Sequence, residues 1–91
     1  MPAPMARITL EVTQFLSRTF GNRPGIGDVQ DHTPLFTGGL VDSFGVLQLI
    51  AFLVERFGVE IDTARHDLTD FDTLAKIETL VAALQQERSG R

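Results

Sequence analysis

The residues with the clearest capacity for chemistry are Asp42 and Ser43, where a glycine-rich segment meets a long apolar run. Three kinds of chemistry are open to them. Asp and Ser can cap a helix, because their oxygens accept the unpaired amide N–H groups of its first turn. Ser43 could instead be a nucleophile, with His32 or His66 as its base. It could also be an attachment site, because a hydroxyl that another enzyme modifies needs no activation within this chain.

The nucleophile hypothesis is the least favoured of the three. A hydrolase nucleophile elbow has the pattern G-x-S-x-G on a turn between a strand and a helix. Here Val41 replaces the first glycine, and no strand is predicted before it. The attachment hypothesis has physical support, because a phosphodiester on Ser43 would lie at the positive end of a helix dipole.

Composition narrows the class of protein. The chain has 91 residues, 12 acidic against 8 basic residues, a formal net charge of −4 and no cysteine. The acidic balance argues against nucleic acid as a partner, since phosphates require a basic surface. Without cysteine, disulfides and thiolate zinc sites are excluded. No secretory signal and no run long enough to span a membrane is visible, so we expect a cytoplasmic protein. We also expect it to be a monomer.

Helical periodicity predicts most of the fold. No stretch alternates with period two for long enough to predict a strand. The segments expected to be helical are 6–20, 43–57, 67–71 and 74–86. The fold class is therefore expected to be all-α, a small four-helix bundle of three main helices plus one short helix, with a long first loop. We expect one domain over 1–91, with its core at about 6–86.

Glycines and polar residues mark the ends of these helices. Gly21 and Gly58 each follow a last apolar residue, where a left-handed residue is usually glycine. Asp72 or Thr73 is expected to cap the last helix. The tail, 87–91, is expected to be disordered.

A loop of about twenty residues joins the first two helices, which is long for a compact domain. We expect it to be mobile around Gly25-Ile26-Gly27. Burying one large apolar side chain contributes about 1.5–3 kcal/mol, so a few such residues could hold the loop on the core. The residues expected to do so are Val29, Leu35, Phe36 and Leu40.

The second helix is more apolar than the surface of a bundle requires, since only Gly45 and Gln48 interrupt the run from Phe44 to Val54. A chain of this size cannot enclose a helix on all sides, and exposed apolar patches often mark partner surfaces. The alternative is that the flanking helices and the loop cover it. The residues expected in the core are Leu49, Ile50, Leu53 and Phe57. Those expected to face outward are Leu47, Gln48, Ala51 and Val54.

The ordered motifs around Ser43 resemble those of the phosphopantetheine-dependent carrier proteins, which include acyl, aminoacyl, peptidyl and D-alanyl carriers. The matching motifs are Leu35-Phe36, Gly39-Leu40, Asp42-Ser43-Phe44, Phe57-Gly58-Val59 with Ile61, and Phe71-Asp72-Thr73-Leu74 with Ile77. The resemblance covers about residues 8–86.

The resemblance implies that Ser43 carries a 4′-phosphopantetheine arm, which a separate magnesium-dependent phosphopantetheinyl transferase takes from coenzyme A. The arm would hold an acyl or aminoacyl group as a thioester and would be the only thiol of this cysteine-free chain. By the same resemblance, Asp42 helps the transferase to dock and Phe44 anchors the start of the helix. The protein would then be a phosphoprotein and no enzyme itself.

The implied partners are an adenylating enzyme or acyltransferase that loads the arm, and a downstream synthase or transferase. The residues expected to contact them are Leu47, Gln48, Ala51, Val54 and Glu55. Fatty-acid carriers typically have several acidic residues along this helix, where this chain has mostly uncharged ones. The pattern therefore favours aminoacyl, D-alanyl or specialised-metabolite carriers. The alternative of another class is a helical interaction module that is never modified and docks through the second helix.

Overall fold

A computed structural model describes residues 4–89, so residues 1–3 and 90–91 of the predicted domain lie outside the described residues. The elements, in chain order, are α1 (Pro4–Phe20), the 3₁₀ helix η1 (Ile26–Asp28), α2 (Ser43–Phe57), the 3₁₀ helix η2 (Leu68–Phe71) and α3 (Leu74–Ser89). The described residues include no strand. The predicted all-α class, with three main helices and a short one before the last, is confirmed. None of the described helices is long and apolar enough to cross a membrane.

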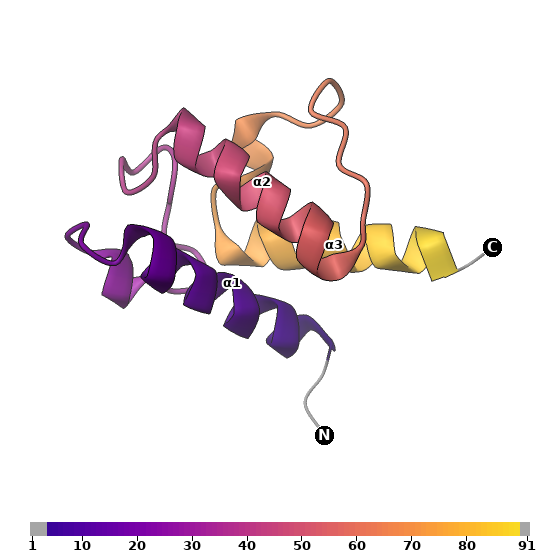
Figure 1. The fold of residues 1–91 in the computed structure, drawn as a ribbon, viewed down its shortest axis with the longest axis horizontal. Coiled ribbons are helices and arrows are strands. Elements are labelled where there is room, and N and C mark those ends of the chain that lie inside the picture. Colours follow the sequence, from indigo (N-terminus) through magenta and orange to yellow (C-terminus); the bar gives the residue numbers. More distant parts are fainter. Residues whose placement is uncertain (1–3, 90–91) are drawn as a thin grey trace.

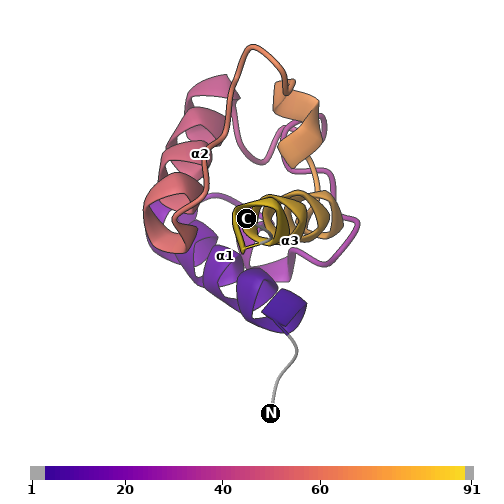
Figure 2. The same ribbon diagram turned by 90° about the vertical axis from the view of Figure 1, so that its right-hand side faces the viewer.

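The three α-helices surround one core (Figure 1). In that view α1 runs from right to left, α2 and α3 run from left to right, and the long loop joins α1 to α2 at the left-hand end. Figure 2 looks along α3, with α2 at its upper left, α1 at its lower left and η2 above it on the right. The start of α2 therefore lies at the end of the bundle where the loop is folded.

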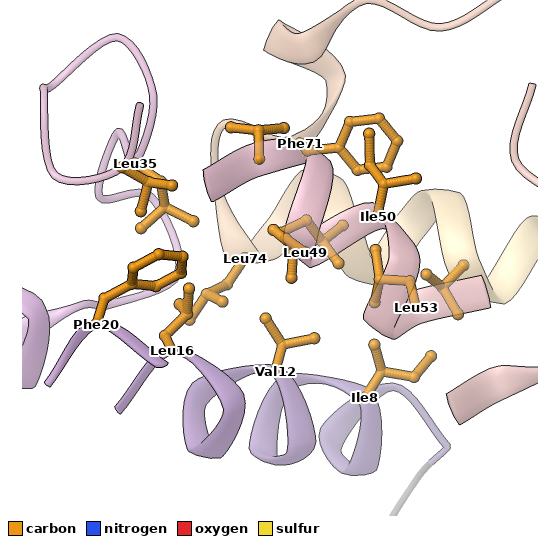
Figure 3. Packing of buried hydrophobic residues seen from close by; sticks show 14 of the residues in the cluster. Ile8, Val12, Leu16, Phe20, Leu35, Leu49, Ile50, Leu53, Phe71 and Leu74 are labelled. Carbon is orange, nitrogen blue, oxygen red and sulfur yellow. The ribbon is translucent and has the colours of Figure 1, made fainter. Parts of the chain in front are cut away.

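The core is built from residues one helical turn apart, which is why the apolar spacing predicted it. Figure 3 shows α1 directing its buried side chains toward Leu49 and Leu53 of α2. The buried residues of α1 are Ile8, Val12, Leu16 and Phe20. Leu49, Ile50 and Leu53 are buried as predicted, whereas Phe57 is only half-buried.

Aromatic side chains extend this core between α1 and α2. Phe15 and Phe52 stack with their ring centroids 4.5 Å apart. Phe52 also meets Phe57 edge-on, at 6.2 Å between the centroids. Such pairs contribute about 0.5–1.5 kcal/mol beyond the area that they bury. The half-buried Phe57 is thus held by a ring contact at the end of α2.

The helix ends agree only in part with the prediction. Gly58 has φ 65° and donates its N–H to the carbonyl of Val54 at 3.1 Å, which confirms the predicted left-handed cap. Gly21 follows α1 as expected, but the positive-φ residues of the described chain do not include it. A side chain there would meet the carbonyl oxygen of Ser17 at 2.3 Å. The prediction of a disordered tail is wrong for residues 87–89, because α3 continues to Ser89.

The first loop is more fixed than predicted near its start. Ile26, expected in a mobile stretch, begins η1 and is buried in the core at 4% exposure. Gly25 makes the turn into η1 with φ 90°. The left-handed conformation of Gly25 lets the chain turn sharply just before the isoleucine, so that its side chain reaches the core. Further along, the expected contacts are confirmed: Leu35 is buried, and Val29, Phe36 and Leu40 are partly buried against the core.

Candidate functional site

At the start of α2, one residue caps the helix and the next presents an exposed hydroxyl. Asp42 has the extended backbone of an N-cap (φ −84°, ψ 179°), and its Oδ1 accepts the N–H of Gly45 at 2.8 Å. Its carbonyl oxygen accepts the N–H of Val46 at 2.9 Å. Ser43, the first residue of α2, is exposed, and its hydroxyl has no hydrogen-bond partner among the described residues. Asp42 therefore caps the helix, as predicted, and leaves Ser43 available for other chemistry.

Arg23 is a neighbour of this site that the sequence did not indicate. Its Nη1 donates to the carbonyl oxygen of Leu40 at 3.3 Å, and its Nη2 lies 4.0 Å from Oδ2 of Asp42. The guanidinium also lies over the ring of Phe20, 5.3 Å from the centroid. An exposed pair of this kind adds little to stability. Arg23 places a positive charge close to the negative charge of Asp42 at the start of α2.

Close packing, and not Phe44, anchors the start of α2. Phe44 is 67% exposed, so it does not hold the start of α2 by burial, and the role predicted for it beside the arm stays a prediction. A helix start is held by the residues that face inward, and position 44 faces outward. Gly45 is buried, and a Cβ there would lie 2.4 Å from Cγ1 of Val41 and 3.1 Å from the Phe20 ring. A glycine at position 45 lets α2 approach the end of α1 this closely.

Gly45→Ala is expected to lower the free energy of unfolding by about 1–3 kcal/mol, because overpacking outweighs the helix-propensity gain of about 1 kcal/mol. Urea denaturation followed by circular dichroism measures this. Gly27→Ala is the matched control, since a Cβ at Gly27 meets nothing within 4 Å. It should be neutral or slightly stabilising. Equal effects of the two substitutions would contradict the packing argument.

An exposed apolar surface runs along α2 from Ser43. We call it the apolar stripe and define it as Phe44, Leu47, Ala51 and Val54, which share one helix face because they are three or four residues apart. Phe44, Leu47 and Val54 are 67%, 48% and 38% exposed. Gln48 and Glu55, beside the stripe, are also exposed. The outward face is thus as predicted, and the alternative that the flanking helices and the loop cover almost all of α2 is wrong. Its role in docking remains a prediction.

The two histidines line one pocket, and Ser43 is not part of it. His32 and His66 line one open pocket of about 740 Å³, whose lining residues do not include Ser43. Nδ1 of His66 lies 3.7 Å from Oδ2 of Asp70. The structure therefore does not assemble Ser43 with a histidine base. Within residues 4–89 there is also no cluster of three potential metal ligands.

Asp72 has a role that the sequence analysis missed. Thr73, the other candidate, caps α3 by accepting the N–H of Lys76 at 3.1 Å. The carboxylate of Asp72 instead reaches back to the first loop. Its Oδ1 accepts the N–H groups of Phe36 and Thr37 at 2.8 Å each, and its Oδ2 accepts the Thr37 hydroxyl at 2.8 Å. The sequence offered two adjacent residues for one cap, but no local pattern indicated the loop as the partner of Asp72.

The environment of Asp72 keeps its carboxyl ionised. Burial raises the pKa of Asp72, but the hydrogen bonds from Thr37 and Phe36 and the charge of Lys76 outweigh it, so the pKa lies below its usual value. It is the one buried charged side chain among the described residues. A buried carboxylate that accepts three hydrogen bonds is a strong tie between the loop and the start of α3.

The fold and this site define a class: a small helical bundle that presents an unpaired serine at the start of its second α-helix. No protein-family model matches the chain. A comparison with curated proteins does find similar sequences. The chain is 37% identical over 51 residues to D-alanyl carrier protein 2 of Lactiplantibacillus plantarum, which is 56% of this chain and 64% of that protein. D-alanyl carrier protein 1 of the same organism gives the same values.

A third relative has the same kind of name. D-alanyl carrier protein of Lacticaseibacillus casei is 41% identical over 51 residues, which is 56% of this chain and 63% of that protein. The chain thus spans less than two thirds of the length of each of these relatives. D-alanyl carriers are among the proteins that the motifs around Ser43 resemble, so these relatives confirm the resemblance found in the sequence.

Proposed function

We propose that this protein is a carrier whose Ser43 receives a 4′-phosphopantetheine arm and which passes an aminoacyl group between enzymes. The observation that supports this most directly is the exposed Ser43 hydroxyl, which the capping bond of Asp42 leaves without a structural task. The names of the relatives support the aminoacyl cargo. The uncharged apolar stripe beside Ser43 agrees with a partner contact that is mainly hydrophobic.

The residues around Ser43 fit a phosphate-linked group. The amide groups of Ser43 and Phe44 precede the first intrahelical bond of α2, which runs from Val46 to Asp42. Such amides and the helix dipole favour an anion at this end. Arg23 adds a positive charge near Asp42. These groups would offset the negative charge that the modification brings.

The attachment step needs no catalytic residue of this chain. The Ser43 oxygen forms the new bond to phosphorus, the pyrophosphate bond of coenzyme A breaks, and adenosine 3′,5′-bisphosphate leaves. The transferase accepts the hydroxyl proton and supplies the magnesium site. When bound, the arm supplies a terminal thiol, a group that this cysteine-free chain lacks. What the chain contributes is an accessible hydroxyl on a rigid helix end.

The proposed partners follow from this chemistry. An adenylating enzyme activates the amino acid and loads the arm, and a downstream transferase removes it. Both must approach the start of α2, and both would therefore meet the apolar stripe. Of the carrier types that the sequence left open, the D-alanyl type is the one that the relatives favour.

A second candidate function is an interaction module that is never modified. The exposure of Phe44, Leu47 and Val54 favours it, since such a face would serve any helical partner. This candidate gives the Asp42-Ser43 pair no role beyond capping, whereas Asp42 caps α2 without help from Ser43.

The test is covalent modification of the wild-type chain. The protein is incubated with coenzyme A, magnesium and a broad-specificity phosphopantetheinyl transferase, and its intact mass is measured. We expect a gain of one phosphopantetheinyl group, which peptide mapping should place on Ser43. A wild-type chain that keeps its mass while a known carrier is modified in the same reaction would leave the interaction module as the better proposal.

A further inference from the structure

A backbone hydrogen bond fixes each end of the segment that leads to Ser43. At its start, the N–H of Leu35 donates to the carbonyl oxygen of Asp72 at 2.7 Å. At its end, the N–H of Val41 donates to the carbonyl oxygen of Leu35 at 2.9 Å. Leu35 and Val41 are both 1% exposed. Residues 35–41, which we call the approach loop, thus form a closed turn whose last residue comes directly before Asp42.

Asp72 supplies most of the polar contacts that hold the approach loop to the bundle. Besides the backbone bond to Leu35, its carboxylate accepts three hydrogen bonds at 2.8 Å, from the two N–H groups of Phe36 and Thr37 and from the Thr37 hydroxyl. Hydrogen bonds to an ionised acceptor are about twice as strong as neutral ones. All of these bonds join residues more than 30 positions apart in the chain.

The approach loop is packed against the first turn of α2, so fixing the loop also restricts the position of Ser43. Val41 lies against Gly45, where even one added carbon would come within 2.4 Å of it. A shift of the approach loop must therefore move Val41 against the first turn of α2. Arg23 holds the same segment from outside, through the carbonyl of Leu40. The position of Ser43 thus depends on a loop that the buried carboxylate of Asp72, just before α3, holds in place.

We propose that Asp72 is a positioning residue for the modification of Ser43: it holds the approach loop in the shape that the phosphopantetheinyl transferase recognises. This inference rests on the proposed function. Asp72 is buried and so does not itself contact the transferase. Its effect is on how well the enzyme binds the carrier, because the chemistry at the Ser43 oxygen is unchanged.

Loss of the carboxylate should loosen the loop without unfolding the bundle. In Asp72→Asn the neutral amide oxygen can still accept the two N–H groups, but more weakly than a carboxylate does, and the NH2 group that replaces Oδ2 cannot accept the Thr37 hydroxyl. Thr37 is exposed and Phe36 is only partly buried, so water can compete for the weakened bonds. The core under the loop consists of apolar contacts that Asp72→Asn does not change. The variant keeps the volume of the side chain and removes the charge.

Steady-state kinetics of a transferase with variable carrier concentration tests the proposal, with amide hydrogen exchange as a second measurement. Asp72→Asn should raise KM for the carrier about tenfold and leave kcat within about twofold, with faster exchange at Phe36 and Thr37. Thr37→Val should change KM in the same direction by less. Thr37→Ser, which keeps the hydroxyl, should restore the wild-type KM.

A destabilised control separates positioning from general stability. Ile77→Val removes a methyl group from a fully buried side chain of α3, at 0% exposure, and typically costs about 0.5–1.5 kcal/mol. It should leave KM within about twofold of wild type. An unchanged KM in Asp72→Asn or in Thr37→Val, or an equal rise in Ile77→Val, would overturn the inference alone. A wild-type chain that is never modified would overturn the proposed function with it.

Discussion

A Ser43→Ala variant is expected to fold like the wild type and to take no phosphopantetheinyl group at all. The hydroxyl has no hydrogen-bond partner among the described residues, and the capping bond of α2 comes from Asp42. Its removal should therefore change the free energy of unfolding by no more than about 0.5 kcal/mol, as for other surface positions. The modification, by contrast, requires the oxygen that the variant lacks. Intact mass spectrometry and urea denaturation measure the two effects separately.

Ser17→Ala is the matched control for this loss. Ser17 is an exposed serine in α1, so the variant removes the same atom from a similar environment. It should be modified at the wild-type rate. Modification of Ser43→Ala would place the attachment site elsewhere and overturn the assignment of Ser43. A large loss of stability in that variant would mean that the hydroxyl has a structural role that its exposure does not indicate.

The main helices could be predicted because their signals are local. The apolar spacing of α1 and α3 repeats within the reach of a single helical turn, and the glycine after α2 stops the helix by its own conformational freedom. The candidate site could be predicted from the sequence for the same reason. Asp42 and Ser43 are neighbours in the sequence, and all residues of the apolar stripe belong to the helix that follows them. Phe57, expected in the core, is only half-buried, since an apolar residue at a helix end can serve a core or a surface equally well.

The contacts that the sequence could not indicate join distant parts of the chain. Nothing in the local pattern relates Asp72 to Phe36 or places Arg23 beside Asp42, because those distances are set only when the helices pack. Ile26 was missed for a related reason. Its glycine neighbours suggested mobility, whereas the available space in the core determined that it is buried. Loop structure in this protein is thus a consequence of tertiary packing.

Leu47→Glu is expected to raise the KM of the transferase for this carrier by about 10- to 100-fold while the helical content stays unchanged. Leu47 lies one turn beyond Ser43, about 6 Å along the axis, so an enzyme that reaches the Ser43 hydroxyl must cover it. The side chain is 48% exposed, and a carboxylate there would be buried without a partner in the complex. The fold should tolerate the change, since the new charge faces water in the free protein.

Two further variants decide whether the effect belongs to the apolar stripe. Leu10→Glu places the same charge on an exposed leucine of α1, which is 57% exposed, and should leave KM within about twofold. Val54→Glu lies about 10 Å further along α2 and should have a smaller effect than Leu47→Glu on the transferase. An equal rise in Leu10→Glu would indicate a general response to negative charge. A KM unaffected by Leu47→Glu would mean that the transferase approaches Ser43 from the side of the loop, over Arg23 and Asp42, and that the apolar stripe serves some other partner.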